Sequence, residues 1–234
     1  MSIASNVAAV RERIARAAER VGRDLDSITL MAVSKTVEPE RIRQAYAAGI
    51  RVFGENRVQE FAEKAAALAD LEEAKWHLIG HLQTNKAKRA AEQFHAIDSV
   101  DSLRLAEKLN QSAQQADKRL AVLIEIKVGK EESKSGVPAD SPELDGLLRG
   151  MEQFTNLQVR GLMTVPPLTD DPEGARPFFR MLRDLGDSIA LRKLPRIRMD
   201  VLSMGMSHDF EVAIEEGSTC VRVGTAIFGA RPKP

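Results

Sequence analysis

A lysine at the end of an apolar run is the first residue in this sequence that could do chemistry. Lys35 follows the apolar residues 30–33 and Ser34. In an extended strand alternate side chains share a face, so Lys35 would point the same way as Met31 and Val33. Burying a lysine is unfavourable unless its charge is neutralised or paired, and an imine with an aldehyde cofactor does this while using the nucleophilic amine. The alternative is a lysine that extends from the strand end into water, and this motif alone supports both readings equally.

Two short stretches of small residues lie near the end of the sequence. The first is 203–207, with Ser203 and Ser207 at its ends, and the second is the pair Gly224 and Thr225. Glycine permits close approach of the backbone to a ligand, and Ser207 and Thr225 are suited to begin helices, whose first N–H groups bind anions. We expect the two stretches to form a phosphate-binding cup. Two ordinary loops with capping residues are the alternative.

Arg222 and Asn56 are further candidates for a cofactor site. Arg222 stands between Val221 and Val223 in a strand-like run, so it faces opposite to them. Beside a bound pyridoxal ring, an arginine at the ring nitrogen would keep this nitrogen unprotonated, whereas a carboxylate there would protonate it and create a strong electron sink. The alternative is an arginine paired with a carboxylate at the barrel rim. Asn56 follows another strand-like run and could reach a cofactor or cap the next helix.

The other reactive side chains support weaker hypotheses. His77 and His81 are four residues apart, but the strand-like residues 76–79 argue against one helical face, so no metal pair is expected. Cys220 is expected to be a small core residue rather than a nucleophile. Residues 224–229 have the glycine spacing of a nucleotide P-loop but lack the Lys and Ser or Thr that should follow, and we reject that match.

Alternating strand-like and helical segments would position these residues. An amphipathic helix is expected over residues 3–21, ending at Gly22. The expected strands cover 28–34, 51–54, 76–79, 95–97, 121–127, 158–163, 199–203 and 219–223, and the expected helices begin near Glu38, Arg57, Thr84, Asp101, Ser141, Glu173, His208 and Thr225. Strands separated by helices pair in parallel, so the order predicts an α/β fold, a single (β/α)8 TIM barrel with an extra N-terminal helix. Its functional site would lie at the carboxyl ends of the strands.

Length and composition fit one domain spanning residues 1–234. The chain is 43% hydrophobic and 29% charged, enough for one sizeable core. Basic and acidic residues number 34 each, so no overall field favours nucleic acid or a membrane as a partner. The lone cysteine rules out an internal disulfide and a multi-cysteine metal cluster. No signal-peptide pattern or long apolar run is present, and a cytoplasmic location is expected.

Several motifs together resemble the pyridoxal 5′-phosphate (PLP) homeostasis family, the YggS/PROSC type. They are AVSKT at 32–36, FGENRVQE at 53–60, WHLIGHLQTNK at 76–86, SVDS at 99–102, EESKSGV at 131–137, GLMTV at 161–165 and the long block at 202–231. The resemblance covers nearly the whole chain and implies a barrel of PLP fold type III, related to the N-terminal domain of alanine racemase. It assigns the Schiff base to Lys35, phosphate contacts to Ser203, Ser207, Gly224 and Thr225, a ring-nitrogen contact to Arg222 and a cofactor neighbour to Asn56.

The resemblance also implies a function. Such a protein binds PLP and takes part in intracellular PLP (vitamin B6) homeostasis by delivering or buffering the cofactor, without conventional catalytic turnover, catalytic residues or a metal. Its partners would be PLP and PLP-dependent apoenzymes, and a monomer is expected, with a dimer left open. The sequence departs from the common family pattern at Val37, Arg57 and Lys127, which puts secondary PLP-handling roles of those positions in doubt.

The alternative reading is a PLP-dependent amino-acid racemase. Racemisation in the related fold type uses two bases, the Schiff-base lysine and a tyrosine from an extra domain. The only tyrosine of this sequence, Tyr46, falls in the helix expected after the first strand, where it would pack on the outside of the barrel. A second base is therefore missing unless a His or Cys takes its place. The sequence also indicates no acid placed to protonate the ring beside Arg222. We therefore expect a carrier rather than an enzyme.

Overall fold

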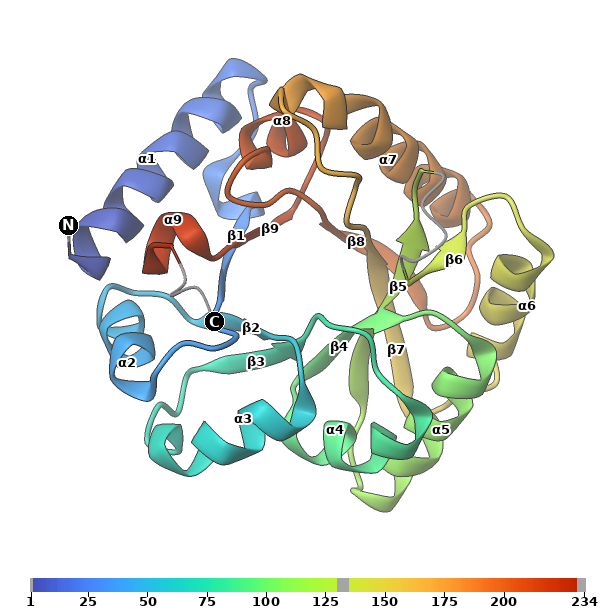
Figure 1. The fold of residues 1–234 in the computed structure, drawn as a ribbon. Helices are drawn as coiled ribbons and strands as arrows, with labels where there is room; N and C mark the ends of the chain where they lie inside the picture. The colour runs from blue at the N-terminus through green and yellow to red at the C-terminus, as the bar shows by residue number, and fades with distance from the viewer. Residues whose placement is uncertain (1, 130–134, 231–234) are drawn as a thin grey trace.

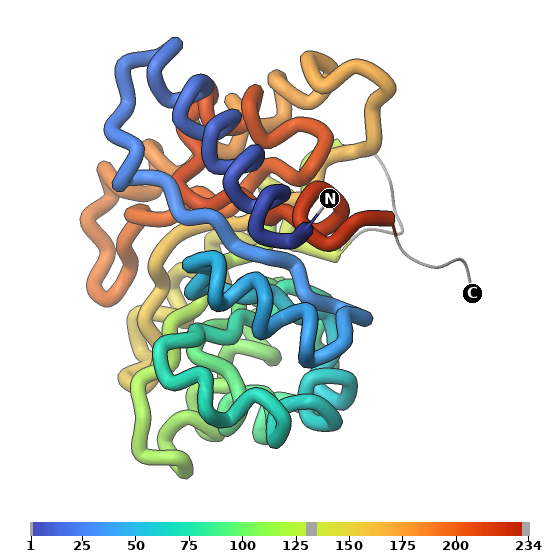
Figure 2. Tube along the Cα trace, turned by 90° about the vertical axis from the view of Figure 1, so that its left-hand side faces the viewer, coloured from blue at the N-terminus to red at the C-terminus, as the bar shows by residue number. Residues whose placement is uncertain are grey.

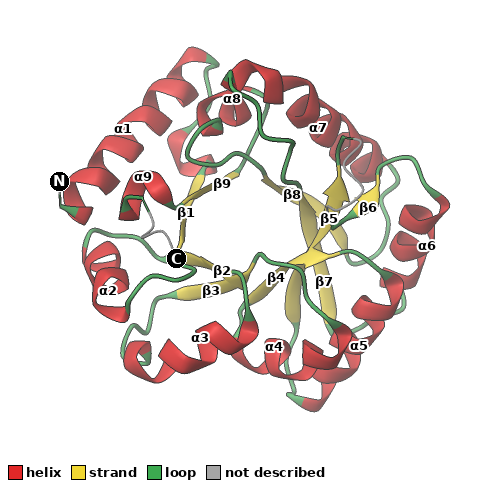
Figure 3. Cartoon of the chain, viewed as in Figure 1, coloured by secondary structure: helices red, strands yellow, loops and turns green. Residues whose placement is uncertain are grey.

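The computed structural model describes residues 2–129 and 135–230, which form a ring of parallel strands surrounded by helices (Figure 1). Within these residues eight strands close a barrel in the order β1, β2, β3, β4, β5, β7, β8, β9. Closure follows from the pairing of β4 with β5 and of β1 with β9. Figure 3 shows the strands on the inside and the helices on the outside. The predicted (β/α)8 barrel with an extra N-terminal helix is confirmed.

The barrel strands lie where the sequence predicts them. Their bounds are β1 Thr29–Val33, β2 Val52–Glu55, β3 Lys75–Leu78, β4 Ala96–Val100, β5 Leu120–Lys127, β7 Leu157–Met163, β8 Ile197–Ser203 and β9 Cys220–Val223. Each overlaps one predicted segment. A further two-residue strand, β6 (Val137–Pro138), pairs only with the end of β5, at Ile126 and Lys127. Two residues are too few to carry a periodic pattern, so the sequence does not indicate β6.

The helices follow the predicted order. Their bounds are α1 Ile3–Arg20, α2 Pro39–Ala47, α3 Val58–Ala65, α4 Ala87–Gln93, α5 Leu103–Gln115, α6 Pro142–Met151, α7 Arg176–Leu191, α8 Phe210–Glu215 and α9 Thr225–Phe228. The predicted starts near Thr84 and Glu173 fall in short 3-10 turns, Thr84–Lys86 and Pro172–Ala175, that lead into α4 and α7. In the described parts of the chain, no helix has the length and apolar character needed to cross a membrane.

Helix α1 covers the outside of the barrel where the chain closes on itself. It begins after Ser2, whose hydroxyl oxygen accepts a hydrogen bond from the Ser5 N–H at 3.1 Å. Its buried face packs against α8, α9 and α2, and Figure 2 shows α1 and α9 side by side. The side-chain amide of Asn6 donates to the carbonyl oxygen of Ile227 at 2.9 Å, which ties α1 to α9.

Aromatic side chains pack between the sheet and two of its helices. Phe53 on β2 stacks on Trp76 on β3, with ring centroids 4.9 Å apart. Phe61 on α3 contacts Trp76 at 4.8 Å and Phe94 at 4.9 Å, just beyond α4. Rings at these separations contribute beyond the apolar area they bury. The cluster therefore fixes α3 and the end of α4 on β2 and β3, the strands that lead to Asn56 and His81.

Gly161 marks an irregularity in β7. The register between β7 and β8 shifts between Val159 and Gly161, and Gly161 has a φ of +156°. A Cβ atom at this position would lie 1.8 Å from the carbonyl oxygen of Val201 on β8. The backbone fixes the position of a Cβ atom and also carries the Val201 oxygen, so no side-chain rotation can relieve the overlap.

We predict that Gly161→Ala lowers the free energy of unfolding by about 1–3 kcal/mol, because β8 must move away from β7. The control is Gly146→Ala in α6, where a Cβ would meet nothing within 4 Å. Alanine favours helix over glycine by up to about 1 kcal/mol, so this variant should be as stable as the wild type or slightly more stable. Urea unfolding followed by circular dichroism measures both, and an unchanged midpoint for Gly161→Ala would contradict the tight β7–β8 approach.

Candidate functional site

The carboxyl ends of the strands bring the predicted site residues to one end of the barrel. Lys35 lies just beyond β1, and Asn56 just beyond its neighbour β2. Arg222 on β9 is in register with Met31 on β1, so it lies beside the strand that leads to Lys35. The predicted residues at this end are Lys35, Asn56, Ser203, Ser207, Arg222, Gly224 and Thr225. Lys35, Asn56, Ser207 and Gly224 are half-buried, Ser203 and Arg222 are buried, and Thr225 is exposed.

The backbone that carries Lys35 is held from the outer side of the sheet by a buried polar network. The Ser34 hydroxyl donates to Oε1 of Glu55 at 2.5 Å. The ammonium group of Lys64, from α3, lies 2.8 Å from the same Glu55 oxygen and 2.8 Å from the carbonyl oxygen of Ser34. Burial raises the pKa of Glu55. The charge of Lys64 and the hydrogen bonds from Lys64 and Ser34 act in the opposite direction. Sequence reasoning missed this network, which fixes the peptide that precedes Lys35.

The two stretches predicted to form a cup are joined by hydrogen bonds. The hydroxyl oxygen of Ser207 accepts from the N–H groups of Gly224 and Ala226, both at 3.3 Å. The N–H of Arg222 donates to the carbonyl oxygen of Gly205 at 3.0 Å. Gly205 has a φ of +91°, and a Cβ there would lie 2.5 Å from that of Ala213, so the loop needs glycine at this point. The structure therefore brings Ser207, Gly224 and Thr225 together as one surface.

Arg222 is fixed inside the barrel. Its guanidinium group donates to the hydroxyl of Ser203 and to the carbonyl oxygen of Thr164, both at 2.7 Å. Burial lowers the pKa of Arg222, an effect opposed by nearby acids that include Asp98 and Glu125. Ser203 is fully buried, and its hydroxyl contacts Arg222 rather than the loop at 224–226. In this geometry Ser203 orients Arg222.

Glu125 on β5 is a buried acid that the sequence argument did not place in the site. It interacts electrostatically with Arg222, so a buried acid lies within electrostatic range of this guanidinium group. The expectation that no acid is placed to protonate the cofactor ring stays a prediction. Burial, together with the charge of Asp101, raises the pKa of Glu125 to about 7, against the opposing effect of Arg222. A period-two pattern in residues 121–127 was the one available signal, because it places Glu125 on the face opposite Ile124 and Ile126.

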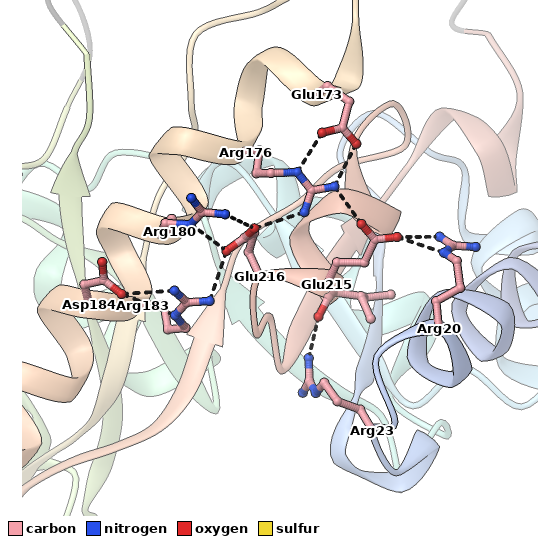
Figure 4. Close-up of polar contacts among 10 residues, drawn as sticks. Arg20, Arg23, Glu173, Arg176, Arg180, Arg183, Asp184, Glu215 and Glu216 are labelled. Carbon is pink, nitrogen blue, oxygen red and sulfur yellow. Dashed lines mark hydrogen bonds and ion pairs between the residues drawn. The ribbon is translucent and has the colours of Figure 1, made fainter.

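A network of charged side chains supports α8, the helix that follows the Ser203–Ser207 loop (Figure 4). Glu216, just after α8, accepts from three arginines on α7: Arg176, Arg180 and Arg183. Glu215 contacts Arg176 at 2.6 Å and Arg20 of α1 at 2.8 Å. The network thus links the end of α8 to α7 and α1.

The two histidines and the cysteine of the sequence analysis each lie in a separate local setting. Nδ1 of His77 lies 3.2 Å from the Asp98 carboxylate, and Nδ1 of His81 lies 3.1 Å from Asp101. The described residues contain no group of three or more His, Cys, Asp or Glu placed to hold a metal. Burial raises the pKa of the Cys220 thiol to about 12, consistent with the predicted core role. Asn56 lines a cleft with His81 and precedes Arg57, the N-cap residue of α3, so Asn56 is not the cap of that helix.

Fold and site together define a barrel of the alanine racemase N-terminal type, and the family model described as "Alanine racemase, N-terminal domain" matches residues 5–232. More narrowly, the chain belongs to the family of pyridoxal phosphate homeostasis proteins. It is 46% identical to the protein of that name from Aquifex aeolicus over 231 residues, covering 99% of each chain. It is 43% identical to that from Escherichia coli K12, covering 98% of this chain and 97% of the relative.

Solved structures agree with this assignment. PipY of Synechococcus elongatus with PLP bound is 38% identical, has a TM-score of 0.85, and is matched over 97% of this chain and 100% of PipY. Alanine racemase from Clostridium difficile is 14% identical with a TM-score of 0.71, and shares the fold. The match covers 99% of this chain but 57% of the racemase chain.

We predict that Glu216→Gln lowers the free energy of unfolding by about 2 kcal/mol, because three arginines each lose one charged partner in a partly solvated setting. Burial acts to raise the pKa of Glu216, but hydrogen bonds from Arg180 and Arg176 outweigh it and hold the pKa below its ordinary value. The stabilisation by Glu216 is therefore present above the ordinary glutamate pKa and is lost as the pH falls through the lowered one.

The measurement is urea unfolding between pH 3 and pH 7, where the difference between wild type and Glu216→Gln should shrink towards acid pH, over roughly the range in which glutamates titrate. Asp184→Asn is the matched control, since this carboxylate also contacts Arg183 but is 62% exposed. The free energy of unfolding of Asp184→Asn should differ little from that of the wild type. A difference for Glu216→Gln that is constant across this pH range would show that the charge of Glu216 is not what stabilises the network.

Proposed function

We propose that this protein binds PLP as a Schiff base on Lys35 and serves intracellular PLP homeostasis by delivering or buffering the cofactor. The observation that carries the proposal is the meeting of Lys35, Arg222 and the Ser207–Gly224 surface at one barrel mouth. Support also comes from the PLP bound in the PipY structure and from the name shared by the curated relatives. The whole chain, residues 1–234, would act as one PLP-binding domain, in the cytoplasm and as a monomer.

The donor groups of the site fit PLP. When bound, PLP supplies an aldehyde that condenses with an amine and a ring that can accept electrons. Lys35 would provide the amine, and Arg222 would donate to the ring nitrogen. Ser207, Gly224 and Thr225 would hold the phosphate with hydroxyl and backbone N–H groups. Ser203 would act through its hydrogen bond to Arg222, and Asn56 would border the ring at the mouth.

We propose further that the protein has no conventional catalytic turnover and that PLP-dependent apoenzymes are its partners. Tyr46 lies on α2, with the guanidinium carbon of Arg51 4.1 Å from its ring centroid. It is therefore unsuited to be the second base of a racemase. Cys220, whose thiol has a pKa of about 12, cannot replace it near neutral pH. The racemase alternative rests on a structural likeness at 14% identity, and a likeness at that level shows the fold alone.

The first test locates the attachment point. Borohydride reduction of the PLP-loaded protein should fix the pyridoxyl group on Lys35, and Lys35→Ala should lose the visible absorbance of the Schiff base. Peptide mapping by mass spectrometry identifies the labelled lysine. Lys108→Ala, an exposed position on α5, is the control and should label normally at Lys35. A label on another lysine, with unchanged PLP affinity in Lys35→Ala, would refute the assignment.

The second test separates a carrier from an enzyme. PLP-loaded protein should reactivate a PLP-dependent apoenzyme, and Lys35→Ala should do so far less well. The same protein should not exchange the α-hydrogen of amino acids in heavy water, because a missing acid or base group typically slows proton transfer by roughly 10²- to 10⁴-fold. Nuclear magnetic resonance measures the exchange. Rapid exchange that depends on Lys35 would favour the racemase.

A further inference from the structure

Glu125 occupies a position in the barrel mouth that the proposed function does not explain. It lies near the carboxyl end of β5, the fifth strand of the ring counted from β1, and so across the barrel from the strand that leads to Lys35 (Figure 1). Its neighbours Ile124 and Ile126 belong to the apolar core between sheet and helices. Glu125 therefore lies on the opposite, inner face of β5, where it interacts with Arg222.

The carboxyl group of Glu125 is incompletely satisfied. The residue is 8% exposed, and its Oε2 atom is buried without a hydrogen-bond partner among the residues that the structure describes. Leaving a buried polar atom without a hydrogen-bond partner is unfavourable. A buried carboxyl oxygen at a binding mouth is therefore a site where a ligand can supply the missing partner.

The groups around Glu125 influence whether its carboxyl group is protonated or ionised, and so whether it attracts or repels an anionic ligand. Arg222, from β9, favours the ionised form, whereas Asp101, from the turn after β4, disfavours it. The β7 residue in register with Glu125 is the apolar Met163, and Lys127 follows two positions later on the same face of β5. Burial has the largest effect and keeps the carboxyl group close to its midpoint of titration at neutral pH.

We propose that Glu125 is a further contact residue for the bound cofactor, that it touches the ring edge bearing the nitrogen and hydroxyl beside Arg222, and that it holds the cofactor more tightly when protonated than when ionised. This inference rests on the proposed function, since it concerns the same mouth. PLP carries a phosphate and a ring hydroxyl that readily ionises, so an ionised carboxylate at the ring edge repels it. A protonated carboxyl group instead donates a hydrogen bond to that edge.

The pH dependence follows from this preference. A ligand that favours protonated Glu125 raises the pKa of this residue above its value of about 7 in the free protein. Binding then takes up a proton near and above neutral pH, and affinity falls as the pH rises. Each unit by which binding raises this pKa corresponds to roughly a tenfold loss of affinity at high pH.

The test compares wild type with Glu125→Gln, which keeps the shape and resembles the protonated acid. The probes are PLP and 4-deoxypyridoxine 5′-phosphate, which lacks the aldehyde and so separates the ring-edge contact from the Schiff base on Lys35. Affinities are measured by calorimetry between pH 6 and pH 8.5 in buffers of different ionisation enthalpy, which also counts protons taken up. We expect equal affinity at pH 6, roughly tenfold tighter binding by Glu125→Gln at pH 8.5, and loss of part of the proton uptake.

Asp101→Asn provides the second variant. It removes a charge that raises the pKa of Glu125, so its fall in affinity should begin at lower pH than in the wild type. Glu107→Gln, an exposed carboxylate on α5, is the matched control and should follow the wild type. Identical pH profiles for wild type and Glu125→Gln would overturn the inference while leaving PLP binding intact. If Glu125→Gln does not fold, an unshifted pH profile for Asp101→Asn overturns the inference. The proposed function itself is overturned if the wild type binds no PLP at any pH.

Discussion

The polar residues inside the barrel, near the carboxyl ends of the strands, are arranged around one buried guanidinium group, that of Arg222. Arg222 is 3% exposed and stays charged at all accessible pH values, so its N–H groups need acceptors and its charge needs acids nearby. Ser203 and the carbonyl oxygen of Thr164 supply the acceptors, which links β9 to β8 and to the end of β7. Asp98 and Glu125 lie within electrostatic reach. The polar residues of the mouth are therefore placed in relation to Arg222.

Both halves of the candidate site are also braced from the outer layer of the fold. The peptide before Lys35 is held by Glu55 and Lys64, between the sheet and α3. The loop from Ser203 to Ser207 leads into α8, whose last residue, Glu215, contacts Arg20 of α1 and is followed by Glu216, which contacts Arg176 of α7. The mouth can thus stay open to a ligand, because the rigidity of its backbone comes from packing behind it.

The sequence predicts the barrel well because each strand is a short apolar run bounded by helical segments, a pattern that is local. It also predicts Lys35, Arg222 and the Ser207–Gly224 surface, because these residues lie at strand ends. It cannot predict the role of Ser203 in orienting Arg222, or the contacts of Glu216 with α7, because these depend on side-chain directions between distant segments. Glu125 was missed for a related reason: an acid inside an apolar strand gives no indication of which charges face it across the barrel.

The hydrogen bond from Asn6 to the carbonyl oxygen of Ile227 joins the first helix to the last, next to the loop that carries Gly224 and Thr225. The ring of strands closes only when β9 pairs with β1, so Lys35 and the segment with Gly224 and Thr225 come to the same mouth only when the first and last barrel strands are both in place. During synthesis on a ribosome, a growing chain would present the lysine long before the loop. The mouth is therefore complete only after β9 has paired with β1, and a nascent chain does not yet have it.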